Sequence, residues 1–141
     1  MAQSGHAIYN SPCPTHEVNS STAGPVAGSE FFTFESVQYP EAALLIKEHK
    51  LLITTDSIQY YSGWSYFSWF TKLVFRLLGF KIGLNIGGPW LKRVTPKGKT
   101  LKGDFERLLA MNFDAIVAAH GGLIQSGAKE LLRKEIRKVF S

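Results

Sequence analysis

The chain has 141 residues, of which 45% are hydrophobic and 19% charged, and its formal net charge is +5. This composition excludes an intrinsically disordered chain and fits one globular domain with a buried core. The excess of Lys and Arg favours anionic partners only in general, and an ordinary basic surface accounts for it. Cys13 is the only cysteine, so an intrachain disulfide is excluded and a reducing compartment is permitted. With neither a signal-peptide pattern nor an apolar run that could span a bilayer, we expect a cytoplasmic protein without a transmembrane segment.

Residues 1–28 are rich in Ser, Gly, Pro, Thr and Asn and lack apolar periodicity, so we expect a flexible N-terminal tail or loop. The spacing of His6, Cys13 and His16 in this segment matches no zinc motif, and we interpret these side chains as idle. The remaining residues, 29–141, are expected to form a single domain.

Residues 29–56 have the pattern of a β-meander. Strands are expected over 30–35, 42–46 and 51–55. A polar turn that contains His49 precedes the third strand, and we expect this histidine to be solvated. The third strand is a buried run of Leu, Ile and Thr that leads directly into Asp56.

The stretch 57–98 is dense in aromatic residues. Residues 65–78 have helical length and are apolar nearly all round, with Ser65 as the expected N-cap. Such a helix could be core, a dimer surface, a lid over a hydrophobic pocket or a membrane-surface element, and we favour core or interface.

Two further segments of this stretch are expected to be irregular. The Gly-rich segment 83–88 lacks the pattern of a phosphate-binding loop, so a turn is predicted. Lys and Arg gather over residues 92–102, where Trp90 is the only aromatic residue close to them. We interpret this segment as a solvated basic loop and expect no nucleic-acid binding, which would need aromatic stacking platforms.

Residues 99–141 are predicted to form helix, strand and helix. Apolar residues at helical spacing indicate an amphipathic helix over 101–109, and a second runs from about 126 to 140. Between them, a short buried strand over 115–119 leads into His120. The Gly-Gly pair that follows allows the loop to fold tightly beneath this histidine.

Asp56 and His120 each follow the carboxyl end of a predicted buried strand. Sites in open sheets lie beyond the carboxyl ends of strands, so this common position suggests one shared site. Imidazole nitrogen and carboxylate oxygen both suit zinc, and mixed nitrogen and oxygen ligands also suit manganese or iron. In the alternative without a metal, Asp56 accepts N–H groups of the following loop, and His120 is a buried neutral histidine bonded to the backbone.

Segments around this pair carry a resemblance. Pro40-Glu41-Ala42 leads a strand, and Gly88-Pro89-Trp90-Leu91-Lys92 precedes the helix that contains Asp104-Phe105-Glu106-Arg107-Leu108-Leu109. In this order and spacing, residues 29–140 resemble the C-terminal half of the metallo-β-lactamase fold family, in a bacterial branch. The resemblance implies an α/β (α+β) fold, namely half of an αββα sandwich in which a β-meander is followed by helix, strand and helix.

The same resemblance implies that Asp56 is a metal-bridging carboxylate and that His120 is the last metal-binding histidine. The family's H-x-H-x-D-H motif occurs nowhere in the chain, and two protein ligands are fewer than a zinc site uses. Two functions stay open: a metal-dependent hydrolase that is weakly active or inactive alone, and a non-catalytic oligomerisation or ligand-binding module on that scaffold. We assign no catalytic residue. Because a half-fold exposes apolar surface, we expect a homodimer or a complementary partner chain through that surface.

Overall fold

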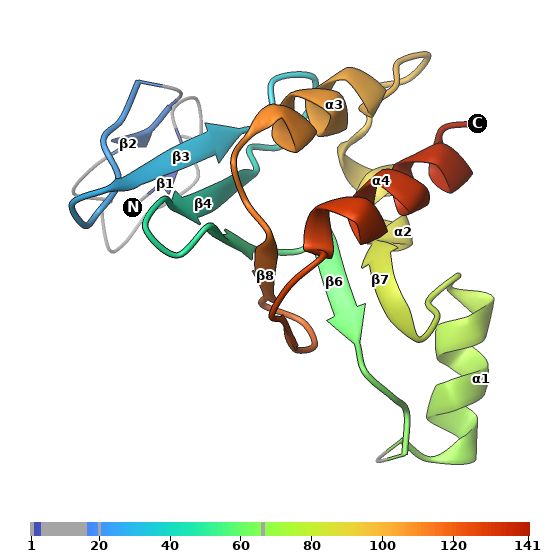
Figure 1. Cartoon of the computed structure of the whole chain (residues 1–141). Helices are drawn as coiled ribbons and strands as arrows, with labels where there is room; N and C mark the ends of the chain where they lie inside the picture. Colours follow the sequence, from blue (N-terminus) through green and yellow to red (C-terminus); the bar gives the residue numbers. More distant parts are fainter. Residues whose placement is uncertain (1, 4–16, 20, 66) are drawn as a thin grey trace.

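A five-stranded sheet forms the centre of the computed structural model, which describes residues 2–3, 17–19, 21–65 and 67–141. The strands are β3 (Ser29–Thr33), β4 (Ala42–Ile46), β5 (Leu51–Thr54), β8 (Ala115–Ala118) and β9 (Leu123–Ile124). They lie in the order β3-β4-β5-β8-β9, and Figure 1 labels β3, β4 and β8 of this sheet. β3, β4 and β5 form an antiparallel meander, as predicted, while β8 lies parallel to β5 and β9 returns antiparallel to β8.

One face of this sheet carries the core. Alternate side chains of a strand point to the same face, and Leu45, Leu52 and Ile116 are almost completely buried there. The helices packed against this face are α3 (Lys102–Ala110) and α4 (Ala128–Val139). Their buried apolar side chains join the same cluster: Phe105, Leu108, Ala128, Leu132 and Ile136.

The opposite face of the sheet also presents apolar side chains, and these are only partly covered. One row crosses all five strands, because the register pairs its members successively: Phe31, Leu44, Ile53, Val117 and Leu123. We call these five residues the open-face row. Ile53 is 37% exposed and Leu123 is 48% exposed. The open-face row is therefore an apolar surface that the described residues leave partly exposed.

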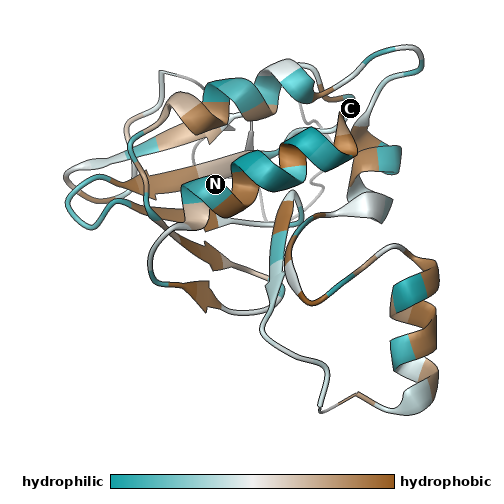
Figure 2. Ribbon diagram, turned by 45° about the vertical axis from the view of Figure 1, so that its right-hand side comes forward, coloured by the Kyte–Doolittle hydropathy of each residue, from teal (hydrophilic) through white to brown (hydrophobic). Residues whose placement is uncertain are grey.

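A second region lies beside the main sheet. The antiparallel strands β6 (Ile58–Tyr61) and β7 (Gly83–Ile86) pair with each other, and helix α1 (Trp69–Leu77) lies between them in the chain. Helix α1 stands at one end of the molecule, apart from α3 and α4, in both views (Figures 1 and 2). The short helix α2 (Gly88–Val94) follows β7. Near the N-terminus, β1 (Ala2–Gln3) pairs in parallel with β2 (Glu17–Val18).

The turn predicted over residues 83–88 is wrong. This segment forms strand β7 and the start of α2. Leu84 and Ile86 alternate along the strand and are both buried, which outweighs the local preference of the glycines for a turn. Pro89 stands in the first turn of α2, where its missing N–H costs no hydrogen bond. The basic stretch expected as a loop therefore begins inside a helix.

The prediction for the aromatic helix is wrong in its start and in its core role. Helix α1 begins after Ser68, whose side chain accepts a hydrogen bond from the N–H of Thr71 at 3.2 Å, rather than after Ser65. None of the residues of α1 is buried, which excludes the core role. The described residues therefore leave the apolar surface of this helix exposed, and it is available for contact with another surface.

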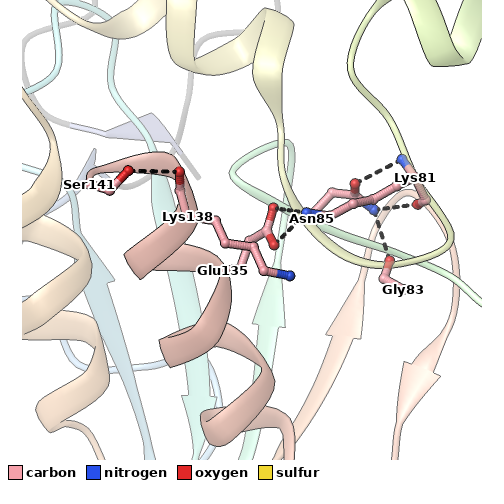
Figure 3. Close-up of polar contacts among 6 residues, drawn as sticks. All are labelled: Lys81, Gly83, Asn85, Glu135, Lys138 and Ser141. Carbon is pink, nitrogen blue, oxygen red and sulfur yellow. Dashed lines mark hydrogen bonds and ion pairs between the residues drawn. The ribbon is translucent and has the colours of Figure 1, made fainter.

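A polar cluster ties the connection between α1 and β7 to helix α4 (Figure 3). Lys81 Nζ lies 2.7 and 2.6 Å from the two carboxylate oxygens of the buried Glu135. The buried Asn85 side chain accepts a hydrogen bond from the Lys81 N–H at 3.0 Å and donates to the carbonyl oxygens of Lys81 and Gly83 at 2.7 and 2.8 Å. Because a buried carboxylate needs a partner, this cluster fixes how the chain leaves α1.

Asp104, predicted near the start of its helix, links α3 to the segment after β3. Its buried carboxylate accepts the N–H groups of Glu35 and Ser36 at 3.2 and 2.9 Å, and Arg107 Nη2 donates to it at 2.8 Å. Burial alone would raise the pKa of Asp104, but the hydrogen bonds from Arg107, Ser36 and Glu35 outweigh burial and lower that pKa. The ionised carboxylate is therefore part of the folded structure.

The fold is a mixed α/β arrangement of sheets and helices, in agreement with the predicted class. Helices α3 and α4 and strand β8 lie within about two residues of their predicted spans, the uncertainty usual for element boundaries. Within the described residues, no helix is both long enough and apolar enough to cross a membrane.

Candidate functional site

Asp56 and His120 meet beyond the carboxyl ends of two neighbouring strands. β5 and β8 are parallel, and their register pairs Thr54 with Ala118, so each functional residue follows its strand end by two positions. His120 Nε2 lies 2.8 Å from Asp56 Oδ1. The side chains are 59% and 57% exposed respectively, which excludes the alternative of a buried histidine. The predicted meeting of these residues is thus confirmed, and the pair is accessible from outside.

The loop that carries His120 is held against strand β6. The His120 carbonyl oxygen accepts the Tyr60 N–H at 3.3 Å, and the Gly122 N–H donates to the Tyr60 carbonyl oxygen at 2.9 Å. Gly121 between them has a φ of +122°, and a Cβ atom at this position would come within 1.7 Å of the Tyr60 carbonyl oxygen. Only glycine fits here, so Gly121 fixes the direction in which His120 leaves the sheet.

The backbone of Asp56 packs closely against the start of α2. A Cβ atom added to Gly87 would lie 2.4 Å from the Asp56 carbonyl oxygen, so the approach requires glycine. The Gly87 N–H also donates to the Ser57 carbonyl oxygen at 3.2 Å. Gln59 Nε2 donates to the Asp56 carbonyl oxygen at 3.4 Å. These contacts position the turn after β5 and leave the Asp56 side chain outside.

Glu41 is a further acidic group of this region, and its sequence context does not predict a role for it. This half-buried carboxylate accepts hydrogen bonds from Thr55 Oγ1 and, at 3.2 Å, from Trp90 Nε1. Burial raises the pKa of Glu41, the charge of Asp56 adds to that rise, and the hydrogen bonds only partly offset it. The register of β4 with β5, continued outward from Leu44 and Ile53, would bring Glu41 opposite Asp56.

A pocket of about 260 Å³ opens beside Asp56. Its lining residues are Asp56, Gln59, Phe80, Pro89, Trp90 and Arg93. Phe80, Pro89 and Trp90 give it an apolar wall, and Arg93 adds a positive charge opposite in sign to Asp56. This volume is slightly below the usual range of ligand pockets, so it suits a small molecule.

The described part of the chain offers too few side chains to complete a metal site. There, no group of three or more His, Cys, Asp or Glu side chains could hold an ion. His49 lies exposed in the turn between β4 and β5, as expected, and is not joined to the pair. His6, Cys13 and His16 lie outside the described residues. Asp56 and His120 therefore form an incomplete set of ligands.

No known protein-family model matches this sequence, and no curated protein is significantly similar to it. The functional assignment consequently depends on the geometry of the site.

Proposed function

We propose that this chain contributes Asp56 and His120 to the metal site of a metallo-β-lactamase-like hydrolase, and that a second chain completes the site. The observation that carries the proposal is the distance of 2.8 Å between Asp56 Oδ1 and His120 Nε2 at the ends of neighbouring parallel strands. Two exposed groups that suit a metal, at such a position in a sheet, can be reached by both an ion and a substrate.

The donor atoms fit zinc, with manganese or iron as alternatives. Two ligand atoms on one tetrahedral zinc ion lie about 3.4 Å apart when each is about 2.1 Å from the metal. A small rotation of either side chain reaches that separation, and both side chains are exposed. When bound, a divalent metal would supply hydroxide near neutral pH by lowering the pKa of a water molecule.

The second chain, a further copy of this chain or a complementary one, is proposed to pack on the open-face row. Ile53 lies three residues before Asp56, and Leu123 lies three residues after His120. A layer packed over this row would therefore bring its own side chains close to the pair. In the proposed αββα arrangement, this chain provides one sheet together with the helices on its outer face.

The pocket beside Asp56 supports a small anionic substrate. Arg93 offers a guanidinium group for a negative charge, and Phe80 and Pro89 offer an apolar wall. The substrate centre that is attacked would lie toward Asp56 and His120. As part of this proposal the protein acts in the cytoplasm, where a chain with Cys13 as its only cysteine needs no disulfide.

A non-catalytic role on the same scaffold is the second candidate. The observation that favours it is the short ligand set, because in the described residues Asp56 and His120 lack the third ligand that zinc sites use. In this case the open-face row would serve oligomerisation, and the pocket would bind a ligand without converting it.

Metal content and native mass, measured on the same sample, test the proposal. We expect zinc in an oligomer or in a complex with a partner chain, and loss of that zinc in both Asp56→Ala and His120→Ala. His49→Ala removes an exposed histidine away from the pair and is the matched control, which should retain the metal. A metal-free protein, or metal content that neither variant changes, would refute the metal site and leave the non-catalytic role.

A further inference from the structure

Helix α1 exposes an apolar stripe. Trp69 is 76% exposed, Phe70 60%, Leu73 47% and Leu77 79%. At about 100° per residue these four side chains fall within an arc of about 100° on the helix. The stripe continues past the helix end, where Leu78 and Ile82 are also exposed. We call Trp69, Phe70, Leu73 and Leu77 the α1 stripe; Figure 2 shows their helix at the margin of the molecule.

The opposite side of α1 is anchored to the rest of the region, so the stripe is held outward. The Phe75 ring lies 5.8 Å from that of Tyr61, 5.0 Å from that of Phe67 and 5.1 Å from that of Phe80, measured between centroids. Just after the helix, Lys81 is tied to Glu135 in the cluster of Figure 3. Turning the stripe inward would break both the aromatic packing and this ion pair.

Positive charge borders the stripe. Lys72 and Arg76 lie one turn apart on α1, on the Trp69 side of the stripe, and the helix contains no acidic residue. Residues 57–103 as a whole contain eight Lys or Arg and no Asp or Glu, whereas the rest of the chain contains eight Lys or Arg and eleven Asp or Glu. The net positive charge of the chain is therefore carried by residues 57–103: Lys72 and Arg76 lie on α1 itself, Lys81 is paired with Glu135, and the other five cations lie between residues 92 and 102.

This charge distribution selects the occupant of the stripe. Two copies of α1 packed stripe to stripe would bring like charges together with no carboxylate on either helix to compensate, which is unfavourable. A helix with Trp, Phe and Leu on one side and cations at its border suits an anionic lipid surface, where aromatic rings lie at the headgroup level. We propose that α1 docks this protein on an anionic bilayer, with the α1 stripe in the boundary between headgroups and acyl chains.

Lys72 and Arg76 are then positioned at the lipid headgroups. Each cation near an anionic membrane surface contributes about 1 kcal/mol to binding, so the two together correspond to about a thirtyfold change in affinity. The helix lies on the surface and does not cross it. This inference is independent of the metal site, because neither Asp56 nor His120 belongs to α1.

Sedimentation with vesicles tests the docking. The full chain should bind vesicles of phosphatidylcholine mixed with phosphatidylserine, bind pure phosphatidylcholine vesicles far more weakly, and be released by salt. The double variant Trp69→Ser, Leu77→Ser should lose at least about tenfold in affinity. Leu131→Ser, at an exposed leucine of α4, is the matched control and should bind like the wild type.

A second double variant tests how much the two cations of α1 contribute to vesicle binding. Lys72→Gln with Arg76→Gln should weaken binding to the anionic vesicles about thirtyfold and leave the weak binding to phosphatidylcholine unchanged. Asp56→Ala should bind vesicles normally, which separates this proposal from the metal site.

Three results would overturn the docking: no binding of the folded wild type to anionic vesicles, equal binding of the stripe variant and the wild type, or dimerisation that Leu77→Ser abolishes without any vesicle binding. The wild type alone also provides a test that no folding defect can obscure. Its tryptophan emission should shift to the blue with anionic vesicles, because Trp69 leaves water.

Discussion

Helix α4 and helix α1 use their apolar side chains in opposite ways, and the parts of the chain around them differ in charge. Helix α4 packs against β7 and β8 and buries its apolar stripe, including Leu132, and all the Asp and Glu residues lie outside 57–103. In residues 57–103 every charge is positive, and α1 leaves Trp69 and Leu77 exposed. Both helices have an apolar stripe. Such a stripe predicts a surface that is covered, but it does not indicate whether this chain or another molecule covers it.

The largest expected effect comes from truncating one leucine in each helix. Leu132→Ala in α4 removes a completely buried side chain and should lower the free energy of unfolding by about 3 kcal/mol. Leu77→Ala in α1 should change it by less than about 0.5 kcal/mol, because that side chain is 79% exposed. Urea denaturation of both variants measures the difference. Similar losses would mean that α1 is packed against the chain, and the contrast between the two regions would fail.

The next largest effect on stability is expected where the loop of His120 contacts strand β6, at the junction of the two regions. Gly121→Ala forces a side chain into a left-handed conformation and against the Tyr60 carbonyl oxygen, so we expect a loss of about 2 kcal/mol or more. Gly122→Ala is the matched control, since its Cβ would lie 3.6 Å from the Tyr60 ring, an ordinary contact. Thermal unfolding gives the stability, and the NMR signals of the His120 ring report whether the histidine has moved. Equal behaviour of the two variants would contradict the tight junction.

A smaller effect on stability is expected at Asp104, which lies outside residues 57–103, in the part of the chain that contains all the acidic residues. Asp104→Asn should cost about 1.5 kcal/mol at neutral pH, because the charged carboxylate accepts several hydrogen bonds. The pKa of Asp104 is lowered in the folded state, so the ionised carboxylate contributes to the free energy of unfolding above the unfolded pKa of about 3.9. As pH falls through the lower folded value, this contribution is lost.

Denaturation at neutral and at acidic pH measures that change. The difference in stability between the wild type and Asp104→Asn should shrink at acidic pH. Glu106→Gln, at an exposed acid of the same helix, should show little difference at either pH. A constant difference for Asp104→Asn across the pH range would argue against an ionised Asp104 in the folded state.

Four strands of the main sheet and its two helices could be predicted from the sequence because their signals are local, whereas the short strand β9 was not predicted. The apolar runs before Asp56 and His120 have strand length, and α3 and α4 have apolar residues at helical spacing. The meeting of Asp56 with His120 followed from the tendency of strand ends to share a site, and the parallel register of β5 and β8 produces it.

The remainder could not be predicted because it depends on contacts between distant segments. Residues 83–86 are rich in turn formers, and they become a strand only through pairing with β6 and burial of Leu84 and Ile86. Glu41 approaches Asp56 through the register of β4 and β5, which a single sequence does not fix. The exposure of α1 likewise depends on which side of the helix packs into the aromatic cluster around Phe75. The sequence of the helix alone does not determine that side.

Tyr60 and Tyr61 are adjacent in β6, and alternation along the strand directs them to opposite sides. The Tyr61 ring contacts Phe75 of α1, while the backbone of Tyr60 holds the loop of His120. The anchor of the exposed helix and the support of the histidine are thus separated by a single peptide bond. Because the two tyrosines are consecutive in β6, one short strand serves both the aromatic packing of α1 and the placement of the His120 loop.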